Sequence, residues 1–183
     1  MNTIYTTNRL ILKNLEPSFH NGALVLRFLT DNKNIFEPYE PLRNQTYYTN
    51  TFQKNNLAAE RKAFRTLSFA RFYVFLKEEP DYIIGTVSIG NVTKEPVNSC
   101  SIGYKFDKNF QRQGYAFEAV DLAINIAFFH MDMKIINAFI QNTNTASLHL
   151  IEKLGFQAVN HGGRMIQVNG DWKGHYKYTL ARP

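Results

Sequence analysis

The sequence predicts a mixed α/β (α+β) fold, in which helices pack on a mostly antiparallel central sheet. Three consecutive strand-like segments in the middle of the chain are separated only by short turns, which is typical of an antiparallel meander. Strand-like and helix-like segments then alternate toward the C-terminus. The 183 residues contain no repeat, low-complexity stretch or Gly/Ser linker, so we expect one domain over residues 1–183.

The first part of the chain predicts a strand followed by helices. Residues 9–13 have strand character, and the helix-start residues 16–18 precede apolar residues at helical spacing (Leu24, Val25, Phe28 and Leu29). Residues 46–66 combine spaced apolar side chains with a basic outer face, which predicts one or two further helices.

The central segments 69–76, 83–92 and 100–106 predict three strands joined by turns at residues 79–81 and 95–98. A polar loop at 107–114 then leads into a helix whose apolar residues recur from Ala116 to Phe128. Residues 134–141 predict a strand and residues 144–154 a helix that ends at Gly155. Residues 156–180 predict a last pair of strands around a turn at 169–171.

Composition excludes several classes of protein. A hydrophobic content of 44% and a charged content of 20% are those of a globular chain. No apolar run reaches the roughly 18 residues of a membrane-spanning helix, and the N-terminus lacks the layout of a signal peptide, so we expect a cytoplasmic protein without a membrane partner. The single cysteine, Cys100, excludes an internal disulfide and a cysteine-rich metal site, and we expect no metal. The net charge of +6 favours anionic partners, but there is no direct nucleic-acid motif.

The most informative segment lies between a predicted strand and a predicted helix. It consists of Gln111, Arg112, Gln113, Gly114, Tyr115 and Ala116. A loop in this position directs backbone N–H groups toward one point, and the helix N-terminus adds partial positive charge, so the loop can bind a pyrophosphate. The segment has neither the Gly-Lys-Ser/Thr of a P-loop nor the three glycines of a dinucleotide fingerprint. On these residues alone, phosphate binding and an ordinary glycine-containing helix cap both remain open.

The loop resembles the Gln/Arg-x-x-Gly-x-Gly/Ala signature of the GNAT superfamily of N-acetyltransferases. Residues 144–147 and 153–156 resemble the motif that follows the next strand in that family, and the similarity extends to residues 9–12, 102–104, 118–119 and 168–172. The resemblance covers nearly the whole chain and is strongest for the branch of ribosomal-protein N-terminal (RimJ/RimL-like) acetyltransferases. It implies a GNAT-like sheet with helices on both faces and two splayed parallel strands, which end near Phe106 and Gln141.

The resemblance also implies acetyl-CoA (coenzyme A) as the cofactor and direct attack of an amine on the thioester. Cys100 is then not needed as a nucleophile. Residues 111–116 would cradle the pyrophosphate, with Lys108 or Arg112 as countercharge, and Asn144 would hydrogen-bond the pantetheine arm. The gap between the splayed strands would be lined by Ile102, Gly103, Tyr104 and Lys105.

Catalysis needs a group that protonates the leaving thiolate and a group that deprotonates the amine. Many superfamily members donate the first proton from a tyrosine, but the corresponding position here is Ile151. The branch that this chain resembles uses a serine as the proton donor or as a hydrogen-bond partner of the cofactor sulfur. The resemblance therefore assigns this role to Ser147, with Tyr104 as an alternative. Some relatives carry a glutamate at the position of Ser101. In its absence a carboxylate acting through water is expected, with Glu40 or Glu37 as candidates, although both equally suit a proline-stiffened surface turn. Ser147 could instead bond to a carbonyl of its own helix.

The expected function is therefore acetyl-CoA-dependent N-acetylation, with a ribosomal or other protein N-terminal α-amine as the first candidate acceptor. A small-molecule acceptor (a polyamine, amino acid or amino sugar) is the alternative among enzymes. A catalytically weak acyl-CoA-binding or RNA-associated module is the alternative outside them. The sequence allows a monomer or a homodimer.

Overall fold

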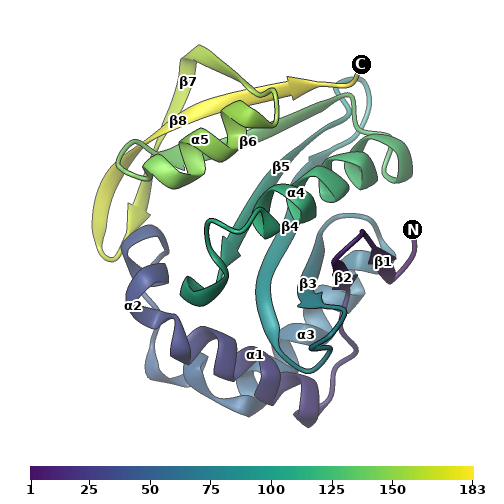
Figure 1. The fold of residues 1–183 in the computed structure, drawn as a ribbon. Helices are drawn as coiled ribbons and strands as arrows, with labels where there is room; N and C mark the ends of the chain where they lie inside the picture. The colour runs from purple at the N-terminus through teal and green to yellow at the C-terminus, as the bar shows by residue number, and fades with distance from the viewer.

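The computed structural model describes the backbone of residues 1–183 and the side chains of all but residues 160–162. Eight strands form one sheet in the order β1-β2-β3-β4-β5-β6-β8-β7. Adjacent strands are antiparallel except for β5 and β6, which are parallel. The predicted fold class, a mostly antiparallel mixed sheet, is therefore confirmed (Figure 1).

The strands are β1 (Ile4–Thr6), β2 (Leu10–Lys13), β3 (Ala70–Leu76), β4 (Ile83–Thr93), β5 (Ser99–Phe106), β6 (Ile135–Gln141), β7 (Gln157–Val168) and β8 (Asp171–Ala181). The α-helices are α1 (Phe19–Asp31), α2 (Lys33–Phe36), α3 (Asn50–Arg65), α4 (Tyr115–Asn125) and α5 (Thr145–Lys153). Three 3-10 turns, η1 (Glu37–Tyr39), η2 (Gln45–Tyr48) and η3 (Lys108–Phe110), connect them, and a π-helical turn, η4 (Ile126–His130), continues α4. None of the described helices is long and apolar enough to cross a bilayer.

Helix starts follow the capping residues of the sequence. The Ser18 hydroxyl accepts a hydrogen bond from the Asn21 amide at the start of α1, and the Thr49 hydroxyl accepts one from Phe52 at the start of α3. These contacts satisfy amides that have no partner inside the helix. Strand β1 was not predicted, because its three residues are too few to show an alternating pattern and are held by pairing with β2.

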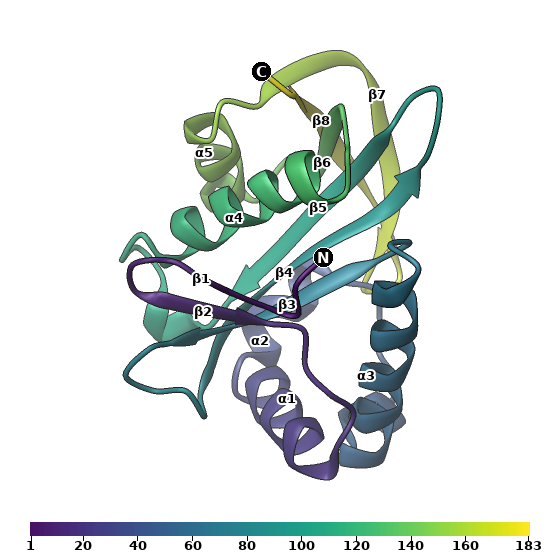
Figure 2. The same cartoon turned by 90° about the vertical axis from the view of Figure 1, so that its right-hand side faces the viewer.

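Helices cover the two faces of the sheet unequally. Helices α4 and α5 lie on one face, whereas α1 and α3 lie on the other and cover only the β3–β5 half (Figures 1 and 2). We call these the α4/α5 face and the α1/α3 face. The larger core lies on the α4/α5 face and includes Phe72, Val87 and Ile136, and the smaller one includes Tyr73, Phe75 and Leu57. On the α1/α3 face, the β6–β8–β7 half has no helix over it.

Candidate active site

Strands β5 and β6 separate after a short paired stretch. They pair only where Ser99, Cys100 and Ser101 face Ile135, Ile136 and Asn137. Beyond this point each strand stays paired with its outer neighbour, β5 with β4 and β6 with β8, while the edges that face each other are unpaired. Figure 1 shows the strands diverging. The backbone groups along this gap are available to an extended ligand, as at a sheet edge.

The 111–116 loop lies at the wide end of the gap, between η3 and α4. Gly114 is the N-cap of α4 with φ +83°, and Arg112 also has a positive φ of 59°. In the described chain, no backbone amide from 112 to 117 has a hydrogen-bond acceptor outside regular structure, and the first-turn amides of α4 have none within it. The loop therefore presents unpaired N–H groups at a helix N-terminus, which is the arrangement that binds a phosphate group.

An ion pair fixes the start of α4 against the N-terminal hairpin. The Arg9 guanidinium donates to Glu118 Oε2 at 2.7 Å and to the Gln113 carbonyl at 3.1 Å. The Thr7 hydroxyl and the Arg9 amide donate to Glu118 Oε1. Burial alone would raise the pKa of Glu118, but these hydrogen bonds together hold it below its ordinary value. Glu118 is thus an anchor for the helix and the loop.

The charged groups beside the loop differ in exposure. Asp107 is 1% exposed and accepts hydrogen bonds from the Asn32 amide and the Tyr82 hydroxyl, both at 2.8 Å. Its carboxylate thus organises the turn and is shielded from the loop. Lys108 and Arg112 are exposed, and no described carboxylate pairs with either. Both remain available as countercharge.

The first turn of α5 faces β5 across the gap. Asn144 caps the helix, its Oδ1 accepting from the Ser147 amide at 3.2 Å. The Tyr104 hydroxyl reaches from β5 and donates to the Ser147 carbonyl at 3.0 Å. Burial raises the pKa of Tyr104, so its phenol stays protonated. The Ser147 hydroxyl is half-buried and has no hydrogen-bond partner among the described residues, so the alternative of a bond to its own helix is not observed.

The residues expected to line the gap divide between the two faces. Ile102 and Tyr104 point to the α4/α5 face, and Ile102 is buried in its core. Lys105 points to the α1/α3 face, where its ammonium donates to Glu40 Oε1 at 2.5 Å. Gly103 places no side chain over the gap, and its carbonyl accepts from the Ser88 hydroxyl at 3.3 Å. Burial lowers the pKa of Lys105, against the opposing effect of Glu40.

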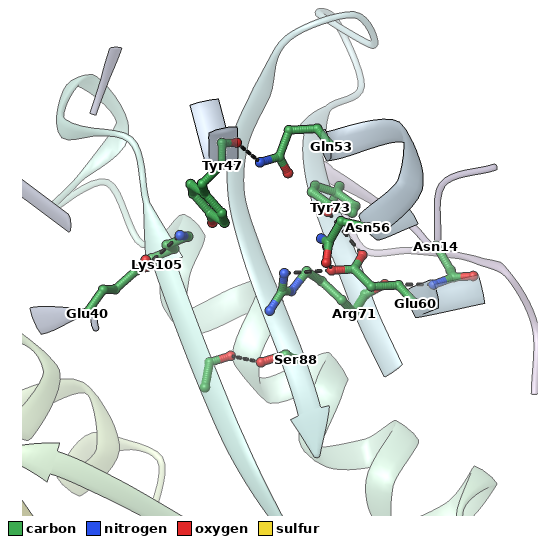
Figure 3. Close-up of polar contacts among 11 residues, drawn as sticks. Asn14, Glu40, Tyr47, Gln53, Asn56, Glu60, Arg71, Tyr73, Ser88 and Lys105 are labelled. Atoms are coloured by element: carbon green, nitrogen blue, oxygen red, sulfur yellow. Dashed lines mark hydrogen bonds and ion pairs between the residues drawn. The ribbon is translucent and has the colours of Figure 1, made fainter. Parts of the chain in front are cut away.

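A second polar cluster lies beside Lys105 on the α1/α3 face (Figure 3). Glu60 of α3 is 6% exposed and accepts from Arg71 at 2.7 Å and from the Tyr73 hydroxyl at 3.1 Å. The strand register aligns Arg71 with Ser88 and Gly103, and Tyr73 with Thr86 and Lys105. The cluster and the Glu40–Lys105 pair thus lie on neighbouring cross-strand rows of the sheet, and each row ends at β5, beside the gap.

The remaining acidic candidate, Glu37, is bound on its own loop. Its carboxylate lies 3.6 Å from the Lys33 ammonium and accepts from the Tyr48 hydroxyl at 3.3 Å. Burial, followed by the charge of Glu37, raises the pKa of Tyr48 to about 12. These contacts fit a structural role for Glu37. Glu40 is the candidate closer to the gap, since its partner Lys105 belongs to β5.

Cys100 lies in the paired part of β5, on the α4/α5 face. It is 1% exposed, and burial raises the pKa of its thiol to about 12. The thiolate is the nucleophilic form of cysteine. A thiol that is buried and protonated in this way is inert as a nucleophile. This fits direct transfer of an acyl group to an acceptor, without a covalent intermediate on Cys100.

The comparison with known families decides the class of the protein. Residues 9–157 match the profile described as "Acetyltransferase (GNAT) domain". The chain belongs to the GNAT family of N-acetyltransferases. It is 27% identical to a probable N-acetyltransferase, YjcK, of Bacillus subtilis (strain 168), over 84% of each chain. It is 24% identical to the [ribosomal protein uS5]-alanine N-acetyltransferase of Escherichia coli (strain K12), over 97% of this chain and 90% of that one.

Solved structures of acetyltransferases have the same fold as this chain. RimJ of Mycobacterium smegmatis, in complex with CoA-disulfide, superposes with a TM-score of 0.87 at 21% identity, covering 98% of this chain and 87% of that one. The predicted resemblance to the RimJ/RimL branch is therefore confirmed at the level of sequence and fold.

Several contacts of this GNAT acetyltransferase could not be predicted from its sequence. The Arg9–Glu118 pair joins residues 109 positions apart, and the Lys105–Glu40 pair joins residues 65 positions apart. Charge and spacing do not reveal such partners. The alternation of β5 was a usable signal for Lys105, because residues 103 and 105 must lie on the face opposite Tyr104.

Proposed function

We propose that this acetyltransferase transfers the acetyl group of acetyl-CoA to the α-amine of a protein or peptide N-terminus in the cytoplasm, and that residues 1–183 act as one catalytic domain. The observation that carries the proposal is the unpaired β5–β6 gap, which ends at a loop of unpaired amides. Two of the relatives support the choice of acceptor and cofactor: one is named for alanine acetylation of a ribosomal protein and another was solved with a CoA disulfide.

The residues present fit CoA on two counts. The amides of Gln111, Arg112, Gln113, Gly114, Tyr115 and Ala116 would hold the pyrophosphate, with Lys108 and Arg112 as countercharge. The unpaired edge of β5 from 102 to 105 would bond the pantetheine arm, and Asn144 keeps its Nδ2 donor for it while its oxygen caps α5. When bound, acetyl-CoA supplies an activated acetyl thioester.

In this proposal the acid is Ser147. Its hydroxyl is half-buried and uncommitted, and it sits on the first turn of α5, where the helix N-terminus stabilises developing negative charge. Tyr104 takes a positioning role, because its proton is directed at the Ser147 carbonyl at 3.0 Å. The hydrogen bond holds the first turn of α5 against β5 and thereby sets the distance between the serine and the gap.

Deprotonation of the acceptor is assigned to Glu40, acting through water. The Lys105 ammonium holds the carboxylate beside the gap. Carboxylates in general are weak bases, which suits an acceptor amine whose own pKa is near neutrality. An α-amine has a reference pKa of about 8, compared with about 10.4 for a lysine side chain.

Thiol release from acetyl-CoA, measured with peptides, polyamines and amino sugars at matched concentrations, tests the proposal. We expect turnover with peptides that have a free N-terminus and none with the same peptides after N-terminal acetylation. Faster turnover with polyamines or amino sugars than with any peptide would replace the proposed acceptor. Binding of CoA without turnover on any amine would favour a non-catalytic acyl-CoA-binding module.

A further inference from the structure

The β5 side of the gap carries a group of cations on the α1/α3 face. Lys105 and Arg71 line a small cavity together with Tyr47, and the Arg43 guanidinium stacks on the Tyr47 ring at 4.6 Å. Lys105 and Arg71 each have one carboxylate partner, Glu40 and Glu60. Arg43 is exposed and has no carboxylate within ion-pair distance among the described residues.

The β6 side of the gap carries cations as well. Phe139 lies in the unpaired part of β6 and, by strand alternation from Asn137, on the same face as Lys105. The Arg164 guanidinium stacks on the Phe139 ring at 4.1 Å. Lys177 of β8 pairs in register with Phe139. Within the described part of the chain, neither Arg164 nor Lys177 has a carboxylate partner.

A backbone hydrogen bond joins the two sides of the gap. The loop that carries Glu40 is joined to the β7–β8 turn, because the Asn169 amide donates to the Glu40 carbonyl at 3.1 Å. Figure 1 shows this end of the β7–β8 hairpin next to α2. We call the group formed by Arg43, Lys105, Phe139, Arg164 and Lys177 on the two sides of the gap the acceptor mouth. Every carboxylate described at it is already ion-paired: Glu40 with Lys105, Glu60 with Arg71, Glu37 with Lys33 and Asp171 with Lys173.

Among the described residues, the acceptor mouth has three unpaired cations and no unpaired carboxylate, so it repels a polycation and attracts an anion. We propose that the preferred acceptor is a peptide N-terminus that carries aspartate or glutamate within its first few residues, so that a carboxylate meets Arg164, Lys177 or Arg43 while the amine enters the gap. This inference rests on the proposed function. It names the class of acceptor that the same site selects.

Three peptides that differ only at positions 2 and 3, with Asp-Asp, Asn-Asn or Lys-Lys, test the preference through kcat/KM for acetylation. We expect the Asp peptide to exceed the Asn peptide by about two- to fivefold, as for one partly screened ion pair, and the Lys peptide to be the poorest. The preference should shrink at high salt, because screening weakens exposed charge pairs. Free aspartate, tested beside them, shows whether the two carboxylates of an amino acid satisfy the site without a peptide chain.

Two variants localise the effect. Arg164→Gln and Lys177→Gln should each lower the ratio of Asp-peptide to Asn-peptide kcat/KM toward one. The matched control is Lys94→Gln, an exposed cation in the β4–β5 turn, which removes the same charge and should keep the ratio. Equal rates for all three peptides, a retained ratio in both mouth variants, or faster acetylation of free aspartate would overturn the inference. Acetylation of polyamines with no peptide acetylated would instead overturn the proposed function.

Discussion

At the scale of single residues, the first turn of α5 brings three polar groups to the gap, each with a separate role. The Asn144 oxygen caps the helix, the Ser147 carbonyl holds the Tyr104 phenol, and the Ser147 hydroxyl is left free. Substituting Ser147 and Tyr104 in turn therefore separates proton donation from helix positioning.

Removal of the Ser147 hydroxyl should affect turnover and leave the cofactor bound. We expect Ser147→Ala to lower kcat by about tenfold to a thousandfold, the range for one lost proton donor, with CoA affinity within about twofold of the parent. Steady-state kinetics and calorimetry measure the two quantities. Ser68→Ala, an exposed serine remote from the gap, is the control. Wild-type kcat in Ser147→Ala, together with a large loss in Tyr104→Phe, would transfer the acid role to Tyr104.

Gly114 can be tested against a second glycine with the same backbone. Gly114 has φ +83° and Gly170, in the β7–β8 turn, has φ +88°. A Cβ at Gly114 would lie 3.2 Å from Arg9 Nη2, whereas one at Gly170 would meet nothing within 4 Å. Because both residues have left-handed φ values, alanine at either position should destabilise the fold by a similar amount, roughly 1–2 kcal/mol.

Affinity for CoA should distinguish these two glycines. We expect Gly114→Ala to weaken binding by about tenfold or more, because it disturbs the amides and the Arg9 contact beside them, and Gly170→Ala to leave binding unchanged. Calorimetry on both folded variants gives the result. Equal CoA affinity in the two variants would remove the 111–116 loop from the binding site.

At the scale of elements, the anchoring of α4 gives the fold a pH dependence. The native pKa of Glu118 lies below its ordinary value of 4.5, so the native carboxyl binds protons more weakly than the unfolded one. Its contribution is complete above that ordinary value and is lost as the pH falls through the lower native value. We expect Glu118→Gln to lower the free energy of unfolding by about 1–2 kcal/mol at pH 7.

Thermal melts of the parent and of Glu118→Gln at neutral and acidic pH measure this contribution. The melting temperatures should differ by about 2–8 °C at pH 7 and converge below the native pKa of Glu118. Asp121→Asn, on the same helix, is the control, since Asp121 has no described ion-pair partner. A difference that persists unchanged at low pH would mean that the carboxylate charge does not hold α4.

The elements with strong local signals were predictable, and those held by tertiary contacts were not. The three strands of the meander, α4 with its loop and α5 carry periodicity and capping residues, and they match the structure closely. Strand β1 and turns η1 and η2 depend on pairing and packing with distant segments. For the same reason the loop and the Ser147–Asn144 pair could be proposed as site residues from the sequence, while the Tyr104 contact and the cations of the acceptor mouth required the strand register.

At the scale of the whole molecule, the sheet consists of two halves that are joined directly only at the paired end of β5 and β6. β5 belongs to the β1–β5 half and β6 to the β6–β8–β7 half, and they meet in three residue pairs. A ligand that bonds both edges should therefore stabilise the whole fold. At a CoA concentration one hundred times its Kd, we expect about 2.7 kcal/mol of added stability, measured as a higher melting temperature. No shift at saturating CoA would contradict binding in the gap.

The most direct test of the proposed acceptor uses one peptide that has both a free α-amine and a lysine side chain. After incubation with acetyl-CoA and the enzyme at pH 7, tandem mass spectrometry locates the acetyl group. We predict acetylation of the α-amine, because it has the lower pKa and loses its proton more readily than the lysine side chain at this pH. Acetylation of the lysine side chain, with the α-amine left free, would contradict the account.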